Sequence, residues 1–288
     1  MRAVVAEYDL KPCDDLLEAL DLVRLGHRPF AGGTDLMVQF ESGRLEHRRF
    51  VDVSRIPDLH GISSADSDSI RIGAAVPYSE ILRHPELAKE FPMLLQAARM
   101  TGAVAIQNRG TLGGNLANAS PAADSPPVLL VHNARIDVVS VRGQREIPIG
   151  EFYLGYKRTA LAPDEMIRSI LIPRHRDGFP IYHYRKVGTR SAQAISKICF
   201  AGLISRDPTD RITDVRIGLG AVGPVPMRCL KTEQVLSGKT PQELNLTAVQ
   251  QILLSEISPI TDLRSTREYR ARVAMNLLQE LIHAKPRG

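Results

Sequence analysis

Cysteine is scarce in this sequence of 288 residues, and its scarcity excludes one large class of sites. Only Cys13, Cys199 and Cys229 occur, far apart and without a Cys-x-x-Cys spacing. Zinc and iron–sulfur sites are usually built from clustered thiolates, so no metal site of this kind is predicted on the chain. A chain of this length can bury a core without disulfides, and its cysteine usage fits a reducing compartment better than a secreted protein.

Long apolar runs are also missing. No stretch approaches the roughly 20 apolar residues that span a bilayer, and Glu7 interrupts the N-terminus before an apolar run of signal length develops. A cytoplasmic protein without a membrane span is therefore expected. The net charge of +5 is mild and the basic residues are scattered, with Glu46 interrupting the cluster over residues 44–49. This pattern is typical of a solvated face, so no nucleic-acid partner is predicted.

The familiar catalytic motifs are absent as well. The sequence has no P-loop, no Gly-x-Gly-x-x-Gly fingerprint, no His-Glu-x-x-His pair and no Gly-x-Ser-x-Gly elbow. His175 and His183 lie near a polar loop, where a histidine is usually solvated. The sequence therefore predicts no self-contained hydrolytic machinery, no catalytic side chain and no metal site.

Length and pattern predict two domains of mixed class, α+β. Residues 1–175 form the first, with subdomains of about 1–55 and 56–175, and residues 180–288 form the second. The boundary is expected between Pro173 and Pro180, where the chain is polar, contains glycine and is bracketed by prolines. The expected strands lie at residues 50–53, 70–76, 136–141, 145–149, 199–205 and 212–220.

Capping residues mark two helices. Asp14 or Asp15 can cap a short helix near the N-terminus, within a β-α-β opening. The last helix is expected to begin at Ser265, because Glu268 completes a Ser-x-x-Glu capping box.

Two glycine-rich turns are the most informative feature that the sequence does contain. They occupy residues 31–36 (Ala-Gly-Gly-Thr-Asp-Leu) and 111–115 (Thr-Leu-Gly-Gly-Asn). A Gly-Gly pair lets backbone N–H groups approach a ligand closely, and successive N–H groups form a concave anion site. One such turn is commonly an ordinary tight turn. Two in one domain indicate a ligand with two phosphates.

Polar side chains near these turns leave two interpretations open. Asp35, Asn115, Asn118 and Asp124 can bind a ribose or a ring edge, or they can cap their own loops as Asx turns. Tyrosines on both sides of the boundary likewise either line an interdomain cleft for a flat ring or simply pack the interface; these are Tyr153, Tyr156, Tyr182 and Tyr184.

Taken together, these motifs resemble the FAD-binding medium subunit of the molybdenum hydroxylases, which includes the flavin subunits of xanthine and carbon monoxide dehydrogenases. The matching segments cover nearly the whole chain; they are residues 31–36, 106–115, 119–124, 152–155, 165–173 and 185–188. The resemblance implies a two-domain FAD-binding fold of the vanillyl-alcohol oxidase type. A smaller α/β C-terminal domain of the carbon monoxide dehydrogenase flavoprotein type follows it.

The resemblance also assigns cofactor positions. The FAD pyrophosphate is held by Ala31, Gly32, Gly33, Thr34, Asp35, Leu36, Thr111, Gly113, Gly114 and Asn115. Asn118 and Asp124 match positions that contact the cofactor, Ile167 lies near its adenine side, and Lys186 matches a lysine beside the flavin. Residues 189–195, which include Arg190, Ser191 and Gln193, border the isoalloxazine ring where the family varies most.

The function implied by the resemblance is electron relay. A molybdenum cofactor on a large molybdopterin-binding subunit hydroxylates the substrate, iron–sulfur clusters on a small subunit pass electrons to FAD on this chain, and NAD+, a quinone or another acceptor receives them. The lack of cysteine clusters argues against the branch whose flavin subunits carry an extra iron–sulfur insertion. Two alternatives remain: a stand-alone FAD-dependent oxidoreductase of the same fold superfamily, and an assembly subunit without cofactor.

Overall fold

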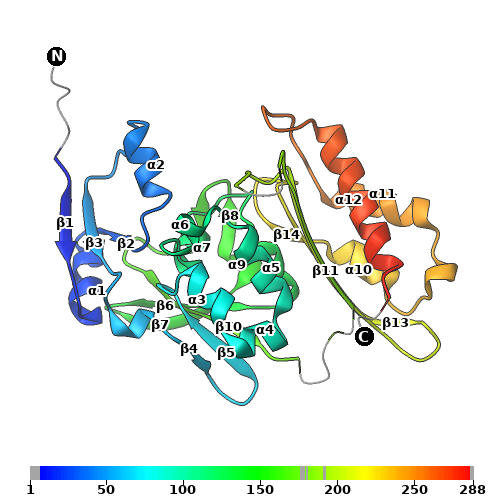
Figure 1. Ribbon diagram of the computed structural model, residues 1–288, viewed down its shortest axis with the longest axis horizontal. Helices are drawn as coiled ribbons and strands as arrows, with labels where there is room; N and C mark the ends of the chain where they lie inside the picture. The colour runs from blue at the N-terminus through cyan, green and yellow to red at the C-terminus, as the bar shows by residue number, and fades with distance from the viewer. Residues whose placement is uncertain (1–6, 176–178, 180, 191–192, 286–288) are drawn as a thin grey trace.

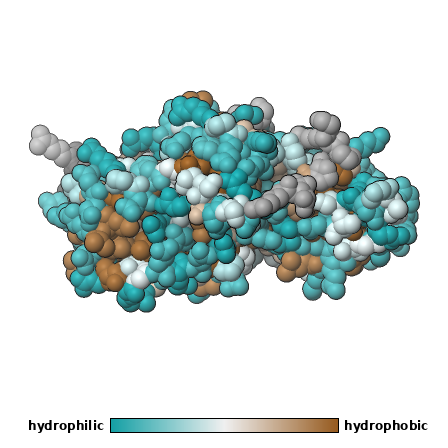
Figure 2. Space-filling view, turned by 90° about the horizontal axis from the view of Figure 1, so that it is seen from below, coloured by the Kyte–Doolittle hydropathy of each residue, from teal (hydrophilic) through white to brown (hydrophobic). Residues whose placement is uncertain are grey.

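The computed structural model describes residues 7–175, 179, 181–190 and 193–285. Two groups of elements lie side by side, with the N-terminal strands at one end and helices α11 and α12 at the other (Figure 1). One face of the molecule is largely hydrophilic, with a hydrophobic area toward the N-terminal end (Figure 2). No helix within the described residues is both long and apolar enough to cross a membrane.

A small parallel sheet in the order β1-β3-β2 opens the chain. Asp15, one of the two predicted caps, accepts a hydrogen bond of 2.9 Å from the N–H of Glu18 and so begins α1. The apolar side of α1 is buried, and α1 and β3 are in contact. The elements of this part are β1 (Asp9–Pro12), α1 (Leu16–Arg24), β2 (Arg28–Phe30), α2 (Leu36–Glu41) and β3 (Arg49–Asp52).

A five-stranded antiparallel sheet in the order β4-β5-β10-β6-β7 follows. The predicted hairpin is present, with Ser140 opposite Gly143 at its turn. The strands are β4 (Ile62–Ser64), β5 (Ser69–Gly73), β6 (Arg135–Ser140), β7 (Gly143–Pro148) and β10 (Met166–Pro173). A separate short pair consists of β8 (Tyr153–Gly155) and β9 (Arg158–Thr159).

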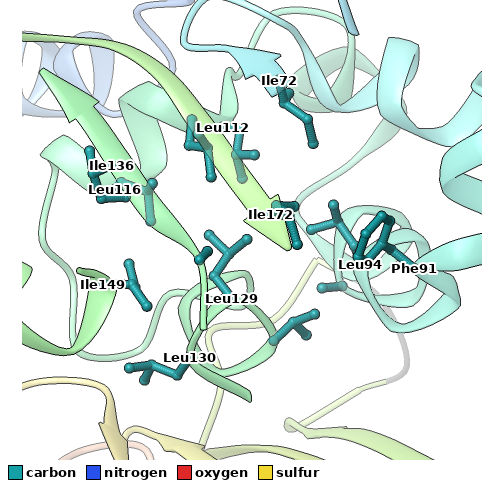
Figure 3. Packing of buried hydrophobic residues seen from close by; sticks show 14 of the residues in the cluster. Ile72, Phe91, Leu94, Leu112, Leu116, Leu129, Leu130, Ile136, Ile149 and Ile172 are labelled. Atoms are coloured by element: carbon teal, nitrogen blue, oxygen red, sulfur yellow. The ribbon is translucent and has the colours of Figure 1, made fainter. Parts of the chain in front are cut away.

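Short helices pack against this sheet and enclose the largest core. Figure 3 shows Leu112, Leu116 and Leu129 from the helices beside Ile136 and Ile172 from the strands. Pro92 occupies the first turn of α5, as the sequence predicts. The helices are α3 (Tyr78–Arg83), α4 (Pro85–Glu90), α5 (Pro92–Met100), α6 (Val104–Gln107), α7 (Leu112–Ala117), α8 (Pro126–Val131) and α9 (Ile149–Phe152).

The C-terminal part is a four-stranded antiparallel sheet, β11-β12-β13-β14, with helices on one face (Figure 1). A Cβ added at Gly202 would lie 2.4 Å from Leu281, so this glycine lets α12 approach β12 closely. The elements are β11 (Ile181–Val187), β12 (Ile198–Arg206), β13 (Ile212–Gly220), β14 (Met227–Arg228), α10 (Leu230–Leu236), α11 (Leu246–Glu256) and α12 (Arg267–Ile282).

The cap of the last helix is Thr266, which accepts from the N–H of Tyr269 at 3.2 Å, so the prediction of Ser265 was wrong by one residue. Ser265 belongs instead to the preceding turn, where its N–H bonds the carboxylate of Asp262. The expected domain boundary falls largely at residues 176–178 and 180, outside the described residues.

Candidate functional site

One cavity of about 720 Å³ brings the two glycine-rich turns together. Its volume is that of a typical site for a cofactor or other sizeable ligand. The first turn reaches it after β2 and the second at the start of α7. The predicted site residues that line the cavity are Ala31, Gly32, Gly33, Thr34, Asp35, Leu36, Thr111, Gly113, Gly114, Asn115, Asn118 and Ile167.

The first turn packs directly on the loop before the second. A Cβ added at Gly32 would lie 1.8 Å from the carbonyl oxygen of Arg109, so any larger residue would force the two backbones apart. A Cβ added at Gly110 would lie 3.3 Å from Oγ1 of Thr34. These two glycines therefore position the turns relative to each other.

The first turn exposes unused backbone donors. In the part of the chain that the structure describes, no hydrogen bond uses the N–H groups of residues 32–36. Gly33 has φ +68°, a conformation that favours glycine, and a Cβ there would lie 2.4 Å from the ring of Phe30. Successive free N–H groups beside a cavity form the concave anion site that the sequence predicts here.

The second turn differs from this expectation, because its own chain uses its backbone donors. The N–H of Leu112 bonds the carbonyl of Val76 at 3.2 Å, and that of Gly113 bonds the carbonyl of Ala74 at 3.0 Å. Gly114 donates to Oγ1 of Thr111 at 3.0 Å, and Asn115 to its carbonyl oxygen at 3.0 Å. The second turn thus offers side chains rather than N–H groups to a ligand.

Asn115 provides such a side chain. Its Oδ1 is buried and finds no hydrogen-bond partner among the described residues. A buried acceptor left unpaired costs about 1–3 kcal/mol. Because Asn115 lines the cavity, a ligand with a donor group at this place would relieve that cost.

Among the described residues, no backbone N–H bonds the side chain of any of the four residues that the alternative interpretation named as caps, which are Asp35, Asn115, Asn118 and Asp124. Asp35 makes no capping bond and instead accepts from Nε2 of Gln39 at 2.6 Å. Both the Oδ1 and the carbonyl oxygen of Asn118 accept from Nζ of Lys157, at 2.8 and 2.9 Å. Both residues line the cavity, with these side-chain oxygens already paired inside the chain.

Lys157 is a site residue that sequence reasoning missed. It lines the cavity from the turn between β8 and β9, with φ +57°. An ammonium group has three donors, and Asn118 takes two of them. Burial lowers the pKa of Lys157, while nearby Asp35 acts in the opposite sense. Lys157 belongs to no sequence motif. Only the folded structure shows that its ammonium group lies near Asp35 of the first turn.

Asp124 and Lys186 lie outside the cavity lining and pair with each other. Nζ of Lys186 is 2.6 Å from Oδ2 of Asp124 and 2.8 Å from the carbonyl oxygen of Met100. Ser196 donates to the other carboxylate oxygen at 2.6 Å. Both side chains of the pair are less than one-tenth exposed. The pair connects the segment before α8 to β11. It lies near the cavity, because Met100, which Lys186 contacts, precedes Thr101 of the cavity wall.

Other expected site residues lie elsewhere. Arg190 bonds the carbonyl oxygen of Gln193, and Ser191 lies outside the described residues. None of the four boundary tyrosines lines the cavity; Tyr78, which the sequence did not single out, does. No group of three or more His, Cys, Asp or Glu side chains within the described ranges is placed to hold a metal ion.

Comparisons with known proteins identify this arrangement. The model of the FAD binding domain in molybdopterin dehydrogenase matches residues 8–175, more than half of the chain. The chain belongs to this family. Residues 182–284 match the C-terminal domain of the CO dehydrogenase flavoprotein. The protein is thus an FAD-binding medium subunit of the molybdenum hydroxylases, with the expected two-domain FAD-binding fold.

Curated relatives cover most of the chain. The nicotine 6-hydroxylase medium subunit of Paenarthrobacter nicotinovorans is 31% identical over 253 residues, which are 88% of this chain and 87% of the relative. The xanthine dehydrogenase FAD-binding subunit of Escherichia coli O157:H7 is 28% identical, over 88% of this chain and 86% of the relative.

Solved structures share the fold. Carbon monoxide dehydrogenase from Hydrogenophaga pseudoflava matches with a TM-score of 0.91 at 24% identity, covering 98% of both chains. Quinoline 2-oxidoreductase from Pseudomonas putida 86 matches with a TM-score of 0.87 at 23% identity, covering 96% of both chains.

Proposed function

We propose that this chain carries FAD in the cavity between its two glycine-rich turns and relays electrons within a molybdenum hydroxylase. The observation that supports this most is the first turn, whose free N–H groups face a cavity within the family's FAD-binding domain. Within the chain, we propose that residues 1–175 form the FAD-binding domain, with subdomains of about 1–55 and 56–175. Residues 180–288 then form the C-terminal flavoprotein domain.

The residues of the cavity fit the proposed cofactor. Residues 31–36 would receive the pyrophosphate oxygens, and the third donor of Lys157 would add a positive charge beside them. Asn115 would accept a hydrogen bond from the cofactor, and Ile167 would contact its adenine side. Lys186 and Asp124 would border the flavin from behind the cavity wall.

Bound FAD supplies redox chemistry that no side chain offers. The chain's part is to hold the cofactor and exclude water from it. We propose that a molybdenum cofactor on a large molybdopterin-binding subunit oxidises the substrate and that iron–sulfur clusters on a small subunit pass the electrons to FAD. The flavin then transfers them to NAD+, a quinone or another acceptor. The hydrophobic area in Figure 2 fits a protein contact of this kind.

A cytoplasmic location belongs to the same proposal. The three cysteines are buried and unpaired, as expected in a reducing compartment.

The second candidate is a stand-alone FAD-dependent oxidoreductase. The names of the relatives, which are medium or FAD-binding subunits, favour the complex. Isolation of the tagged chain from cells that express it, followed by elemental analysis, separates the two. We expect molybdenum and iron to co-purify in a fixed ratio to flavin. Flavin without either metal would support the stand-alone enzyme.

A second experiment addresses the acceptor. Anaerobic bleaching of the flavin spectrum by NADH would identify NAD+ as the acceptor.

A further inference from the structure

One wall of the cavity proposed for FAD is a segment between two strands. Residues 160–165 connect β9 to β10, and four of them line the cavity: Leu161, Ala162, Pro163 and Glu165. The N–H of Glu165 donates to the carbonyl oxygen of Ala162 at 3.0 Å, which closes a tight turn. A segment of this kind lacks the ladder of hydrogen bonds that fixes a strand in a sheet. Side-chain contacts therefore set its position.

The side chain of Glu165 folds back on this segment. Its Oε2 accepts the N–H of Ala162 at 2.8 Å, and only 6% of the side chain is exposed. A carboxylate so far from water needs a charged partner to stay ionised. The hydrogen bond from Arg145 lowers the pKa of Glu165, although burial acts in the opposite sense. Glu165 is therefore charged at neutral pH.

Arg145 of β7 contacts the segment at both of its ends. Its Nε donates to Oε1 of Glu165 and its Nη2 to Oε2, both at 2.8 Å. Nη2 also donates to the carbonyl oxygen of Ala160 at 2.9 Å. One guanidinium group thus bonds the first and the last residue of the segment. The planar fork of arginine allows this two-point contact, whereas the single ammonium group of a lysine does not.

The sheet places Arg145 for this contact. Arg145 is paired with Val138 of β6, and Val138 is paired with Ile167 of β10. Directly paired residues lie on the same face of a sheet, so Arg145 shares a face with Ile167, which lines the cavity. Arg145 itself is not among the described residues that line the cavity. It can therefore act on a ligand through the segment that it holds, and not by direct contact.

A second ion pair meets the same segment but does not hold its backbone. Arg142 donates to the carboxylate of Asp164 at 2.7 and 2.8 Å, and its Nη2 lies 3.8 Å from Oε1 of Glu165, beyond hydrogen-bond distance. Among the described residues, Arg142 makes no hydrogen bond to the backbone of residues 160–165, and Asp164 does not line the cavity. The contact to the wall itself belongs to Arg145.

We propose that Arg145 is a positioning residue for FAD: it holds residues 160–165 through Glu165 and so preforms the wall that receives the adenosine half of the cofactor. The inference rests on the proposed function, in which Ile167, next to this segment, contacts the adenine side of FAD. A wall that is held in place before binding avoids the entropy cost of ordering the segment when FAD binds.

Two measurements on the purified full-length chain test the proposal. The first is hydrogen–deuterium exchange of the flavin-free protein, followed by mass spectrometry over residues 160–165. Arg145→Gln should raise the exchange rate there about tenfold, because the acceptor of the Ala162 N–H is no longer held. The second is the Kd for FMN divided by the Kd for FAD, from fluorescence titrations with each flavin. This ratio should fall about tenfold, because FMN lacks the adenosine half that the wall contacts.

Arg135→Gln provides the matched control. Arg135 lies on the same hairpin and pairs with Glu146 at 3.2 Å, and its side chain is 44% exposed, compared with 49% for Arg145. This variant loses an ion pair of similar exposure that does not involve residues 160–165, so both measurements should match those of the unaltered chain. Arg145→Lys keeps the charge without the two-point contact and should give intermediate values. It replaces Arg145→Gln in the test if that variant does not fold.

Two results would overturn the proposal. Unchanged exchange over residues 160–165 in the Arg145 variants would mean that Arg145 does not hold the segment. Faster exchange with an unchanged ratio of the two Kd values would mean that the segment does not contact the adenosine half, since a general loss of stability weakens the binding of both flavins alike. The proposed function fails in a different way, because the unaltered chain would then bind no FAD, whatever the exchange of the segment.

Discussion

Three features of the main cavity offer polar groups to a ligand: the first turn, Asn115 and Lys157. Among the described residues, the N–H groups of residues 32–36 and the Oδ1 of Asn115 have no hydrogen-bond partner, and Lys157 places a cation on the cavity wall. The glycines of the second turn serve a different purpose: a Cβ added at Gly113 would lie 2.6 Å from Cβ of Ala74. The two Gly-Gly pairs look alike in the sequence, but only the first offers its backbone to a ligand.

At the residue scale, Lys157→Gln should weaken FAD binding. A charge-assisted hydrogen bond contributes about 1.5–3 kcal/mol, so the Kd for FAD should rise about tenfold or more. The affinity of the variant should also depend less on salt, because one cation beside the phosphates is gone. Fluorescence titration with FAD at two ionic strengths measures both effects.

The control for this variant is Lys239→Gln, an exposed lysine of the C-terminal part that does not line the cavity. It should bind FAD like the unaltered chain. Equal affinities for Lys157→Gln and Lys239→Gln would show that Lys157 does not contact the cofactor.

At the scale of elements, local pattern predicted strands and hairpins well. The strand expected at residues 212–220 matches β13, because it follows a strong turn signal at Asp207, whose carboxylate bonds the N–H groups of Thr209 and Arg211. The cap of α12 was misplaced by one residue. Ser265 and Thr266 are equally good caps in the sequence, and the turn at Asp262, which engages Ser265, decides between them.

Contacts between distant segments could not be predicted in this way. Lys157 and Asn118 are 39 residues apart, and nothing in either segment indicates the other. The N–H of Gly113 bonds the carbonyl of Ala74, which lies in the turn after β5. The resemblance to a family predicted the cofactor and the approximate site. Which backbone N–H groups of the two turns remain free, however, depends on these contacts between distant segments.

The misplaced cap leads to a prediction at this scale. Thr266→Ala removes the acceptor for the N–H of Tyr269 and should lower the free energy of unfolding by about 1 kcal/mol. Ser265→Ala, the matched control, keeps that bond and should have a smaller effect. Chemical denaturation of both variants measures the difference; a larger loss for Ser265→Ala would reverse the assignment of the cap.

At the scale of the whole molecule, α8 joins the two parts of the chain. All six of its residues are buried, and it contacts both β12 and β13. A Cβ added at Gly218 of β13 would lie 2.4 Å from the carbonyl oxygen of Pro127, so the backbones of helix and sheet touch. The buried pair of Asp124 and Lys186 reinforces this junction beside the cavity.

Lys186→Met should therefore destabilise the whole chain. It leaves the carboxylate of Asp124 buried without its cation, which costs about 3–5 kcal/mol. The double variant Asp124→Asn with Lys186→Met removes both charges and should recover much of the loss. Thermal unfolding of the flavin-free proteins measures both; equal melting temperatures for the single and double variants would mean that the charge pair does not matter.

The flavin specificity of the purified chain tests the proposed FAD site most directly. Titration with FAD, FMN and riboflavin, with the bound flavin released and identified by chromatography, measures whether the cavity accepts a dinucleotide. We expect one FAD per chain and far weaker binding of FMN and riboflavin, because the first turn and Lys157 are proposed to bind the pyrophosphate that only FAD has. Equal binding of FMN and FAD, or no binding of FAD in excess, would contradict it.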